Sequence, residues 1–357
     1  CPQGSAIVSG SGAIVNVAAN APSLRLNGRV GSTPLAISSG ALGYSRAKGL
    51  TAQNVGIRLG TPGSMTQLDM AVLSAGFGRT INGRIEGASG QVANVPLLME
   101  KIEGEWRYDD GQFLADASLL VRDAQPVERF RPMVSDDVQL RFDGTDIAAT
   151  GWLREPETQT AVAAVDILHR LGNSKGRALI DVPSLKFTER FQPELLTPLT
   201  LGVVANVQGE ISGAGRIDWD SSDNGIKSTG SFRTNGLNLA AAFGPVTGLA
   251  GEIKFSDLLA LETGPGQTVT LSEVNPGVAV FNGQIRYRLL PDYKMQVEGG
   301  EWPFAGGKLY LEPTILDLGE DAERRLQFTV EGVDAAQFLT QFDFENMTAS
   351  GVFDGKL

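Results

Sequence analysis

The sequence predicts an all-β fold made of one long antiparallel meander. Glycine supplies 44 of the 357 residues, well above the usual ~7%, and aromatic residues are few. Asn-Gly or Asp-Gly, the pair that best suits a two-residue hairpin turn, recurs between strand-like segments. It occurs at residues 27–28, 82–83, 110–111, 143–144, 224–225, 235–236, 282–283 and 354–355.

Apolar and polar residues alternate most clearly in residues 269–331. The apolar set is Val269, Leu271, Val278, Val280, Ile285, Tyr287, Leu289, Met295, Val297, Leu309, Leu311, Leu326, Phe328 and Val330. The intervening positions are mostly Thr, Ser, Arg, Gln and Glu. Period-2 alternation of this kind indicates antiparallel strands with one dry face and one wet face.

Earlier segments alternate in the same way and are also predicted to be strands. They are residues 6–19, 24–30, 53–59, 67–75, 81–86, 102–108, 112–121, 137–142, 147–153, 211–219 and 226–234. Residues 161–182 are expected to form a hairpin around the sequence GNSKG.

Helix signals are sparse. In residues 334–342, Asp334 is a plausible N-cap, and Ala335, Phe338, Leu339 and Phe342 share one face. Residues 193–199 predict one short helix that Pro198 interrupts. The apolar face of the predicted sheet therefore has little helix to cover it.

Charge and cysteine content exclude several classes of protein. A net charge of -11 argues against binding to nucleic acid or simple adsorption to anionic lipid. Cys1 is the only cysteine, so no internal disulfide or cysteine-based metal site is expected. We interpret Cys1 as the end of an excised or processed piece, with an acylated lipoprotein N-terminus as the alternative. No apolar run approaches the ~20 residues that span a bilayer.

No catalytic constellation is predicted. GNSKG, residues 172–176, matches the pattern of a nucleophile elbow at Ser174, but the only histidine, His169, precedes it and a strand follows it, whereas the elbow requires a following helix. The hydrolase interpretation is therefore disfavoured. The protein is predicted to be no enzyme and to need no cofactor.

No metal site is predicted either. DWDSSDNG, residues 218–225, begins like a calcium loop with Asp218 and Asp220, but has Asp223 where glycine is required and Thr229 where glutamate is required. A hairpin turn explains it better. His169 is interpreted as a strand residue because it lacks partners for metal binding or acid–base chemistry.

Four stretches together carry a family resemblance: FQPELLTPLTLGVVANVQGEISGAGRIDW (191–219), LAGEIKFSDLLALETGPGQTVTLSEVNPGVAVFNGQIRYRL (249–289), WPFAGGKLYLEP (302–313) and EGVDAAQFLTQFDFENMTASGVFDGKL (331–357). They resemble the YdbH branch of the AsmA/TamB superfamily of bacterial envelope proteins. The resemblance covers about residues 160–357, and the remainder shares only the style of strand and turn.

The resemblance implies a long antiparallel β-meander curled into an elongated U-shaped groove with a hydrophobic interior, with one or two short helices. Residues 1–160 would form its N-terminal part and residues 161–357 its YdbH-like C-terminal part. The implied function is non-enzymatic transport of phospholipid across the periplasm of a Gram-negative bacterium, between the inner and outer membranes. An inner-membrane helix outside this chain and a small outer-membrane lipoprotein partner are expected.

The residues expected to line the groove come from the apolar parity of the strands. They are Leu140, Phe142, Ile217, Phe232, Leu239, Ile253, Phe255, Val269, Leu271, Val278, Val280, Ile285, Tyr287, Leu289, Met295, Val297, Trp302, Phe304, Leu309, Leu311, Leu326, Phe328 and Val330. Trp302 and Phe304 are equally compatible with an ordinary core beneath Gly306-Gly307.

Three alternatives compete with the groove. A closed sandwich or barrel core would make the protein a scaffold. A surface adhesin of the β-solenoid type would bind glycans or proteins, but it predicts a regular short repeat that the chain lacks. A dicarboxylate-binding protein would need alternating strands and helices with a basic pocket, and the helices are missing.

Overall fold

The protein is nearly all β, as a computed structural model shows for residues 5–9, 18–30, 33–93, 95–171, 173, 175–220, 225–241, 244–275, 278–317, 326–342, 344 and 346–356. Strands make up 72% and helical turns 4%, in an antiparallel sheet that is not closed. This confirms the predicted fold class. The chain forms two compact units: unit 1 is Cys1–Ile180 with Ile217–Lys227, and unit 2 is Asp181–Arg216 with Ser228–Leu357. The division predicted between residues 160 and 161 remains a prediction.

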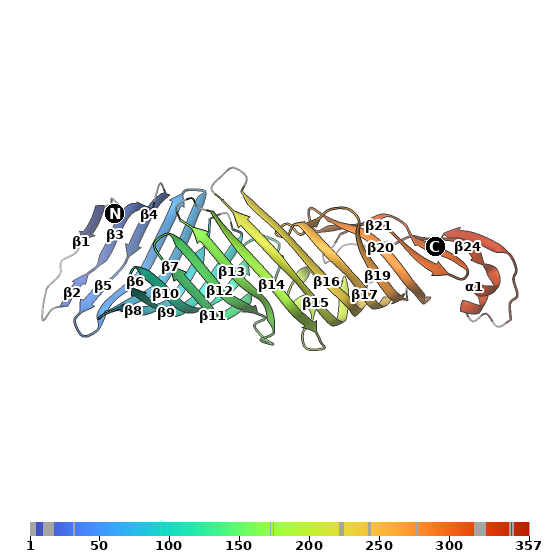
Figure 1. Ribbon diagram of the computed structural model, residues 1–357, viewed down its shortest axis with the longest axis horizontal. Helices are drawn as coiled ribbons and strands as arrows, with labels where there is room; N and C mark the ends of the chain where they lie inside the picture. The colour runs from blue at the N-terminus through green and yellow to red at the C-terminus, as the bar shows by residue number, and fades with distance from the viewer. Residues whose placement is uncertain are drawn as a thin grey trace. The chain divides into compact units, whose positions relative to one another are not determined.

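The strands run side by side in chain order over most of each unit (Figure 1). The first thirteen belong to unit 1: β1 Ser5–Ser9, β2 Ala18–Ala21, β3 Ser23–Val30, β4 Thr33–Ser39, β5 Leu42–Ser45, β6 Gly49–Thr61, β7 Ser64–Phe77, β8 Ile81–Gln91, β9 Leu97–Asp109, β10 Gln112–Asp123, β11 Met133–Phe142, β12 Asp146–Arg154 and β13 Ala161–Arg170.

The remaining strands include three whose residues are divided between the units. Those three are β14 Lys175–Phe187, β15 Val204–Trp219 and β16 Ile226–Ala241. Unit 2 then continues with β17 Gly244–Asp257, β18 Glu262–Thr263, β19 Gln267–Val274, β20 Val280–Leu290, β21 Lys294–Phe304, β22 Gly307–Leu311, β23 Thr314–Asp317, β24 Phe328–Asp334 and β25 Val352–Lys356.

The prediction that the Asn-Gly and Asp-Gly pairs are mostly hairpin turns is wrong. Asp110-Gly111 is such a turn, with positive φ at both residues, and Asp143-Gly144 lies in the turn after β11. Asn224 lies outside the described residues. The other five pairs lie inside strands, at residues 27–28, 82–83, 235–236, 282–283 and 354–355.

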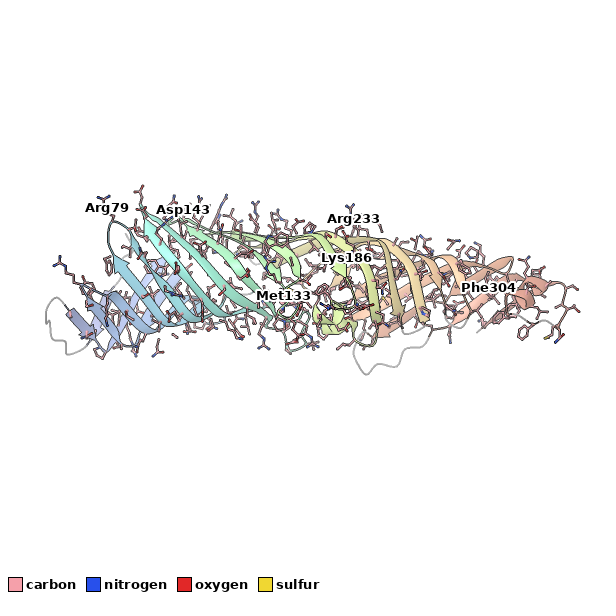
Figure 2. The ribbon with its side chains drawn as sticks, turned by 90° about the horizontal axis from the view of Figure 1, so that it is seen from below. Arg79, Met133, Asp143, Lys186, Arg233 and Phe304 are labelled. Carbon is pink, nitrogen blue, oxygen red and sulfur yellow. The ribbon has the colours of Figure 1, made fainter. Side chains whose placement is uncertain are left out.

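The turn at Asp143, labelled in Figure 2, is closed by its own carboxylate. The backbone amides of Asp146 and Thr145 donate to Asp143 Oδ1 over 2.8 and 3.0 Å. These hydrogen bonds favour the charged form and lower the pKa of Asp143 to about 2.

Some residues in the middle of strands also have a positive φ, although they do not form turns. Asn54 in β6 (φ 51°) and Asn282 in β20 (φ 56°) are examples, and asparagine tolerates this conformation better than most residues. In β20, Val280 and Gly283 are both buried although Asn282 lies between them. The left-handed residue therefore switches the parity of the strand without changing its register against β19, so that apolar residues stay on one face on both sides of it.

The helical predictions are mostly confirmed. Helix α1, Ala335–Gln341, begins at Asp334, whose side chain accepts a hydrogen bond from the Gln337 amide. Residues 193–199 form two 3₁₀ turns rather than one helix, Pro193–Leu195 and Pro198–Thr200. Proline opens each turn because it suits the first helical position.

The sheet of unit 1 is strongly curled. Seven successive strand pairings separate β3 from β11, on the order of 35 Å along a flat sheet. Yet Val30, at the end of β3, lines the same hollow of about 330 Å³ as residues 144–146, Arg170, Leu171 and Asn173. The sheet must therefore bend back to bring these turns together.

Candidate functional site

The apolar face of unit 1 is built from rows of residues that lie opposite one another across neighbouring strands. Directly opposed residues in antiparallel strands share a face of the sheet. One row runs from β5 to β11 through Leu42, Ala52, Leu73, Ile85, Gly104, Ala117 and Val138. Across these strands the row contains no polar side chain.

Two further rows continue this face across the later strands. One contains Gly83, Trp106, Ala115, Leu140, Ala149 and Ile167. The other contains Phe77, Ile81, Tyr108, Phe113, Phe142, Ile147 and His169. Together the three rows define what we call the apolar face of unit 1.

Much of this face is accessible to solvent. Phe77 is 57% exposed and Tyr108 is 43% exposed, while Trp106, Leu140 and Phe142 are half-buried. Among the residues of the three rows, only the small Ala52 is fully buried. An exposed, contiguous apolar surface of this kind marks a binding site more often than a structural feature.

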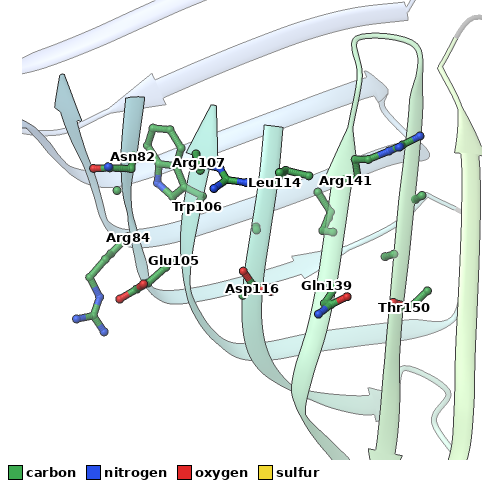
Figure 3. Close-up of a pocket in the computed structure, with 15 residues that line it drawn as sticks. Asn82, Arg84, Glu105, Trp106, Arg107, Leu114, Asp116, Gln139, Arg141 and Thr150 are labelled. Carbon is green, nitrogen blue, oxygen red and sulfur yellow. The ribbon is translucent and has the colours of Figure 1, made fainter. Parts of the chain in front are cut away.

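The opposite face of unit 1 is polar. One of its rows contains Asn82, Arg107, Leu114, Arg141, Ala148 and Leu168, and another contains Arg84, Glu105, Asp116, Gln139, Thr150 and Asp166. A hollow of about 900 Å³ between β8 and β12 is lined by residues of these two rows, as Figure 3 shows. Its lining also includes Trp106, Ala115, Leu140 and Ala149 of the apolar row between them, so it offers both charged and apolar contacts.

Unit 1 and unit 2 both contain a tryptophan laid on a glycine of the preceding strand. INGRI (81–85) is followed by GEW (104–106), and FNGQI (281–285) is followed by GEW (300–302). A Cβ atom on Gly283 would meet Trp302 at 1.8 Å, and one on Gly83 would meet the Ser74 carbonyl oxygen at 1.8 Å and Trp106 at 2.9 Å. Glycine is therefore required at both positions, by the indole at Gly283 and by the neighbouring backbone as well as the indole at Gly83.

Part of the apolar face of unit 2, around Trp302, is packed shut. Its buried cluster consists of Val246, Leu271, Val274, Val280, Val297, Trp302, Phe304, Leu309, Leu311, Val330 and Val333. Trp302 and Val280 are each 2% exposed, and Val333 is completely buried. Phe338 of α1 and Phe342, the C-cap residue that follows α1, pack against this cluster.

Most residues predicted to line a groove belong to this region of unit 2. Those in or against the cluster are Leu239, Leu271, Val278, Val280, Ile285, Met295, Val297, Trp302, Phe304, Leu309, Leu311, Leu326, Phe328 and Val330. Phe232, Ile253, Phe255, Val269, Tyr287 and Leu289 are half-buried, and Ile217 is buried. Their role as a lipid-contacting surface remains a prediction.

Only Leu140 and Phe142 among the predicted residues lie on the open rows of unit 1. Sequence reasoning missed their row neighbours, including Ile81, Ile85, Trp106, Phe113 and Ile147. The same period-2 alternation was present in these strands and could have identified them.

The structure adds no support for the hydrolase site and the calcium loop that the sequence disfavoured. His169 is a residue of β13, and its Nδ1 accepts a hydrogen bond of 3.0 Å from Trp219 Nε1. Burial lowers the pKa of His169, while the Asp146 carboxylate opposes the shift. Asp220 forms an ion pair of 3.6 Å with Lys175. Ser174 and Asp223 lie outside the described residues, as does Cys1.

A buried ion pair holds the connection between β10 and β11. Asp123 and Arg129 are 9% exposed each. The Asp123 carboxylate accepts hydrogen bonds from Arg129 Nη2 over 2.7 Å, from Nε over 2.8 Å and from the Arg129 backbone amide over 2.7 Å. Burial by itself would raise the pKa of Asp123, but the hydrogen bonds and charge of Arg129, with the amide of Gln125, lower it. The pair fixes the loop at the edge of unit 1.

The described part of the chain has neither a cluster of metal-binding side chains nor a helix suited to cross a membrane. No group of His, Cys, Asp or Glu side chains there is arranged to hold a metal ion. Within the same residues, no helix has the length and apolar character needed to cross a membrane.

These features define the class of protein: it is built on an open antiparallel sheet with one apolar face and one polar face. The YdbH-like family, described as intermembrane phospholipid transport protein YdbH, matches residues 5–357. The chain therefore belongs to the YdbH-like family, and the match includes the N-terminal residues in which the quoted stretches carried no resemblance. No curated protein and no solved structure matches the chain.

Proposed function

We propose that this protein transports phospholipid between membranes, holding the acyl chains on the apolar face of unit 1. The observation that carries the proposal is the half-exposed state of that face over strands β5 to β13. A structural core would be covered, whereas a surface that receives an apolar ligand must be accessible before the ligand arrives.

The energetics of lipid transfer demand a surface of this kind. Moving two acyl chains with about 30 methylenes from a bilayer into water costs on the order of 25 kcal/mol, at ~0.8 kcal/mol each. Contact with uninterrupted apolar rows offsets much of this cost. The headgroup stays in water at the open edge, and the polar face keeps the sheet soluble.

Family membership supports the same substrate and setting. The description of the YdbH-like family as intermembrane phospholipid transport implies a location in the cell envelope and a phospholipid cargo. Lipid transport of this kind requires no bond to be made or broken, so we propose that the protein is not an enzyme. An inner-membrane anchor and an outer-membrane lipoprotein partner remain predictions from the resemblance.

The test compares two leucines on adjacent strands and opposite faces. Leu140→Asp places a carboxylate in the apolar row beside Ala115 and Ala149. Leu114→Asp places the same group on the polar face, between Arg107 and Arg141. Each protein is purified without detergent, and the lipid in its organic extract is quantified by mass spectrometry.

We expect phospholipid in the wild type and in Leu114→Asp, and its loss from a still-folded Leu140→Asp. Circular dichroism and thermal unfolding establish that each variant is folded. Lipid-free wild type, or equal lipid in the two folded variants, would overturn the proposal and favour a scaffold whose apolar residues serve only packing.

A further inference from the structure

Helix α1 joins two separate parts of the unit 2 sheet. At its start, the Asp334 amide donates to the carbonyl of Ala305, in the turn between β21 and β22, over 2.9 Å. At its end, Gln341 Nε2 donates to the carbonyl of Ala279, just before β20, over 3.0 Å. Seven residues of helix therefore bridge two places on the sheet that are 26 residues apart in sequence (305 − 279).

The aromatic side chains of α1 are directed at the apolar cluster beneath it. Phe338 meets Phe304 edge-to-face with 6.1 Å between ring centroids, and Phe342 lies 4.4 Å from Phe338. Phe304 is two residues from Trp302 on the same face of β21. The two phenylalanines thus pack against the buried cluster and form part of its covering.

The attachment of α1 is weak for a covering element. None of its residues is fully buried, and a helix of this length is marginal without tertiary contacts. Its contacts are the rings of Phe338 and Phe342, an N-cap, the Gln341 hydrogen bond and two contacts near β25. There the Ala335 amide donates to the Gly351 carbonyl over 3.0 Å, and Phe338 meets Phe353 with 5.2 Å between ring centroids. Each net hydrogen bond contributes only about 1 kcal/mol, so the helix can leave the sheet without unfolding the strands below.

We propose that α1 is a displaceable strap, and that its Phe338 and Phe342 occupy a second acyl-chain site on the apolar face of unit 2. The site is lined by Val280, Trp302, Phe304, Leu309 and Val333. The strap holds this site closed in the absence of lipid, and an acyl chain replaces the phenylalanine rings when the strap leaves. The inference rests on the proposed function, because it assigns a second site for the same ligand.

The equivalent tryptophans provide local reporters for the two units. The chain has four tryptophans: Trp106, Trp152, Trp219 and Trp302. A variant that retains only Trp302, with phenylalanine at the others, reports on unit 2, and one that retains only Trp106 reports on unit 1. The probe is a phosphatidylcholine with brominated acyl chains, presented in phosphatidylcholine vesicles, because bromine quenches indole fluorescence at short range.

Two further changes control the strap. Asp334→Ala with Gln341→Ala removes the N-cap and the bond to Ala279, and so releases it. Ala279→Cys with Gln341→Cys, in a Cys1→Ser background, allows a short bis-maleimide to hold it in place. The matched control is the same cysteine pair capped by a monofunctional maleimide. Circular dichroism establishes that the sheet is intact in each protein.

We expect Trp302 to lose most of its fluorescence in the released variant, less in the capped control and none in the bridged protein. Trp106 should be quenched in all of them. Two outcomes would overturn the proposal that α1 is a strap but leave the proposed function standing. One is quenching of Trp302 in the bridged protein. The other is unquenched Trp302 in the released protein while Trp106 is quenched. Absence of quenching at both tryptophans would overturn the two together.

Discussion

Trp106 and Trp302 occupy equivalent places in the two units but have very different surroundings. Each follows a Gly-Glu pair, and each lies on the glycine of an Asn-Gly pair in the preceding strand. Trp106 is half-buried, whereas Trp302 is 2% exposed. In both, the indole Nε1 is buried without a hydrogen-bond partner.

The difference between them shows that the local motif does not decide whether the apolar face is open. Strand, glycine and tryptophan are the same in both units. In unit 2, Phe304, Phe328 and the side chains of α1 gather around the same face, while the described part of unit 1 has only strands and turns near its rows. The covering elements decide between a closed core and an open surface.

Truncating each of the two tryptophans to alanine should give the largest difference between the units in the free energy of unfolding. Trp302→Ala removes a fully buried side chain and should lower the free energy of unfolding by about 3–5 kcal/mol. Trp106→Ala should lower it by roughly half of that or less, since its ring is already partly in water. Urea unfolding followed by circular dichroism measures both. Equal losses would mean that unit 1 is as closed as unit 2.

The stability of the loop between β10 and β11 should depend on the buried ion pair of Asp123 and Arg129 rather than on apolar contacts. Asp123→Ala leaves the Arg129 guanidinium buried without its partner, and such a change costs about 3 kcal/mol or more. Proteolysis at residues 124–132 and thermal unfolding measure it, with Asp136→Ala as the exposed control because its ion pair with Arg154 lies at the surface. A variant as stable as the control would contradict this role for the pair.

The pKa of Tyr287 reports how far water is excluded from the apolar face of unit 2. Burial raises the pKa of Tyr287 to about 12, above the ordinary value near 10. The folded protein therefore holds the phenol proton more tightly than the unfolded chain, and stability should fall as the pH rises from about 10 to 12. Absorbance of the phenolate against pH measures the ionisation, and Tyr287→Phe removes its contribution.

Protonation of His169, on the apolar face of unit 1, should have the smallest effect on stability. Because burial lowers its pKa, the unfolded chain binds the proton more readily, and the stability that neutral His169 contributes is lost as the pH falls below about 6.5. Protonation of Nδ1 also breaks the bond from Trp219. An NMR titration of the single histidine measures the pKa. In Trp219→Phe, the pKa should rise, and an unchanged value would exclude a contribution from this bond.

Much of the fold was predictable from local pattern. Alternation predicted the strands, and Asp334 with the aromatic residues that follow it predicted α1, because each signal depends on near neighbours in the chain. The Asn-Gly pairs were misassigned because the same dipeptide also fits inside a strand, where only Asn282 of the five in-strand pairs has a positive φ. Position relative to the neighbouring strand, which local sequence does not contain, distinguishes the two.

The sequence by itself determined that the protein is an antiparallel β structure with one apolar face and one polar face, and it carried the family resemblance. Only the tertiary structure decided where that apolar face is open. Val280 and Leu140 have the same pattern in sequence, yet one is buried by strands and a helix brought from distant positions and the other is half-exposed. Burial depends on long-range packing, whereas alternation reports only which side of a strand a residue occupies.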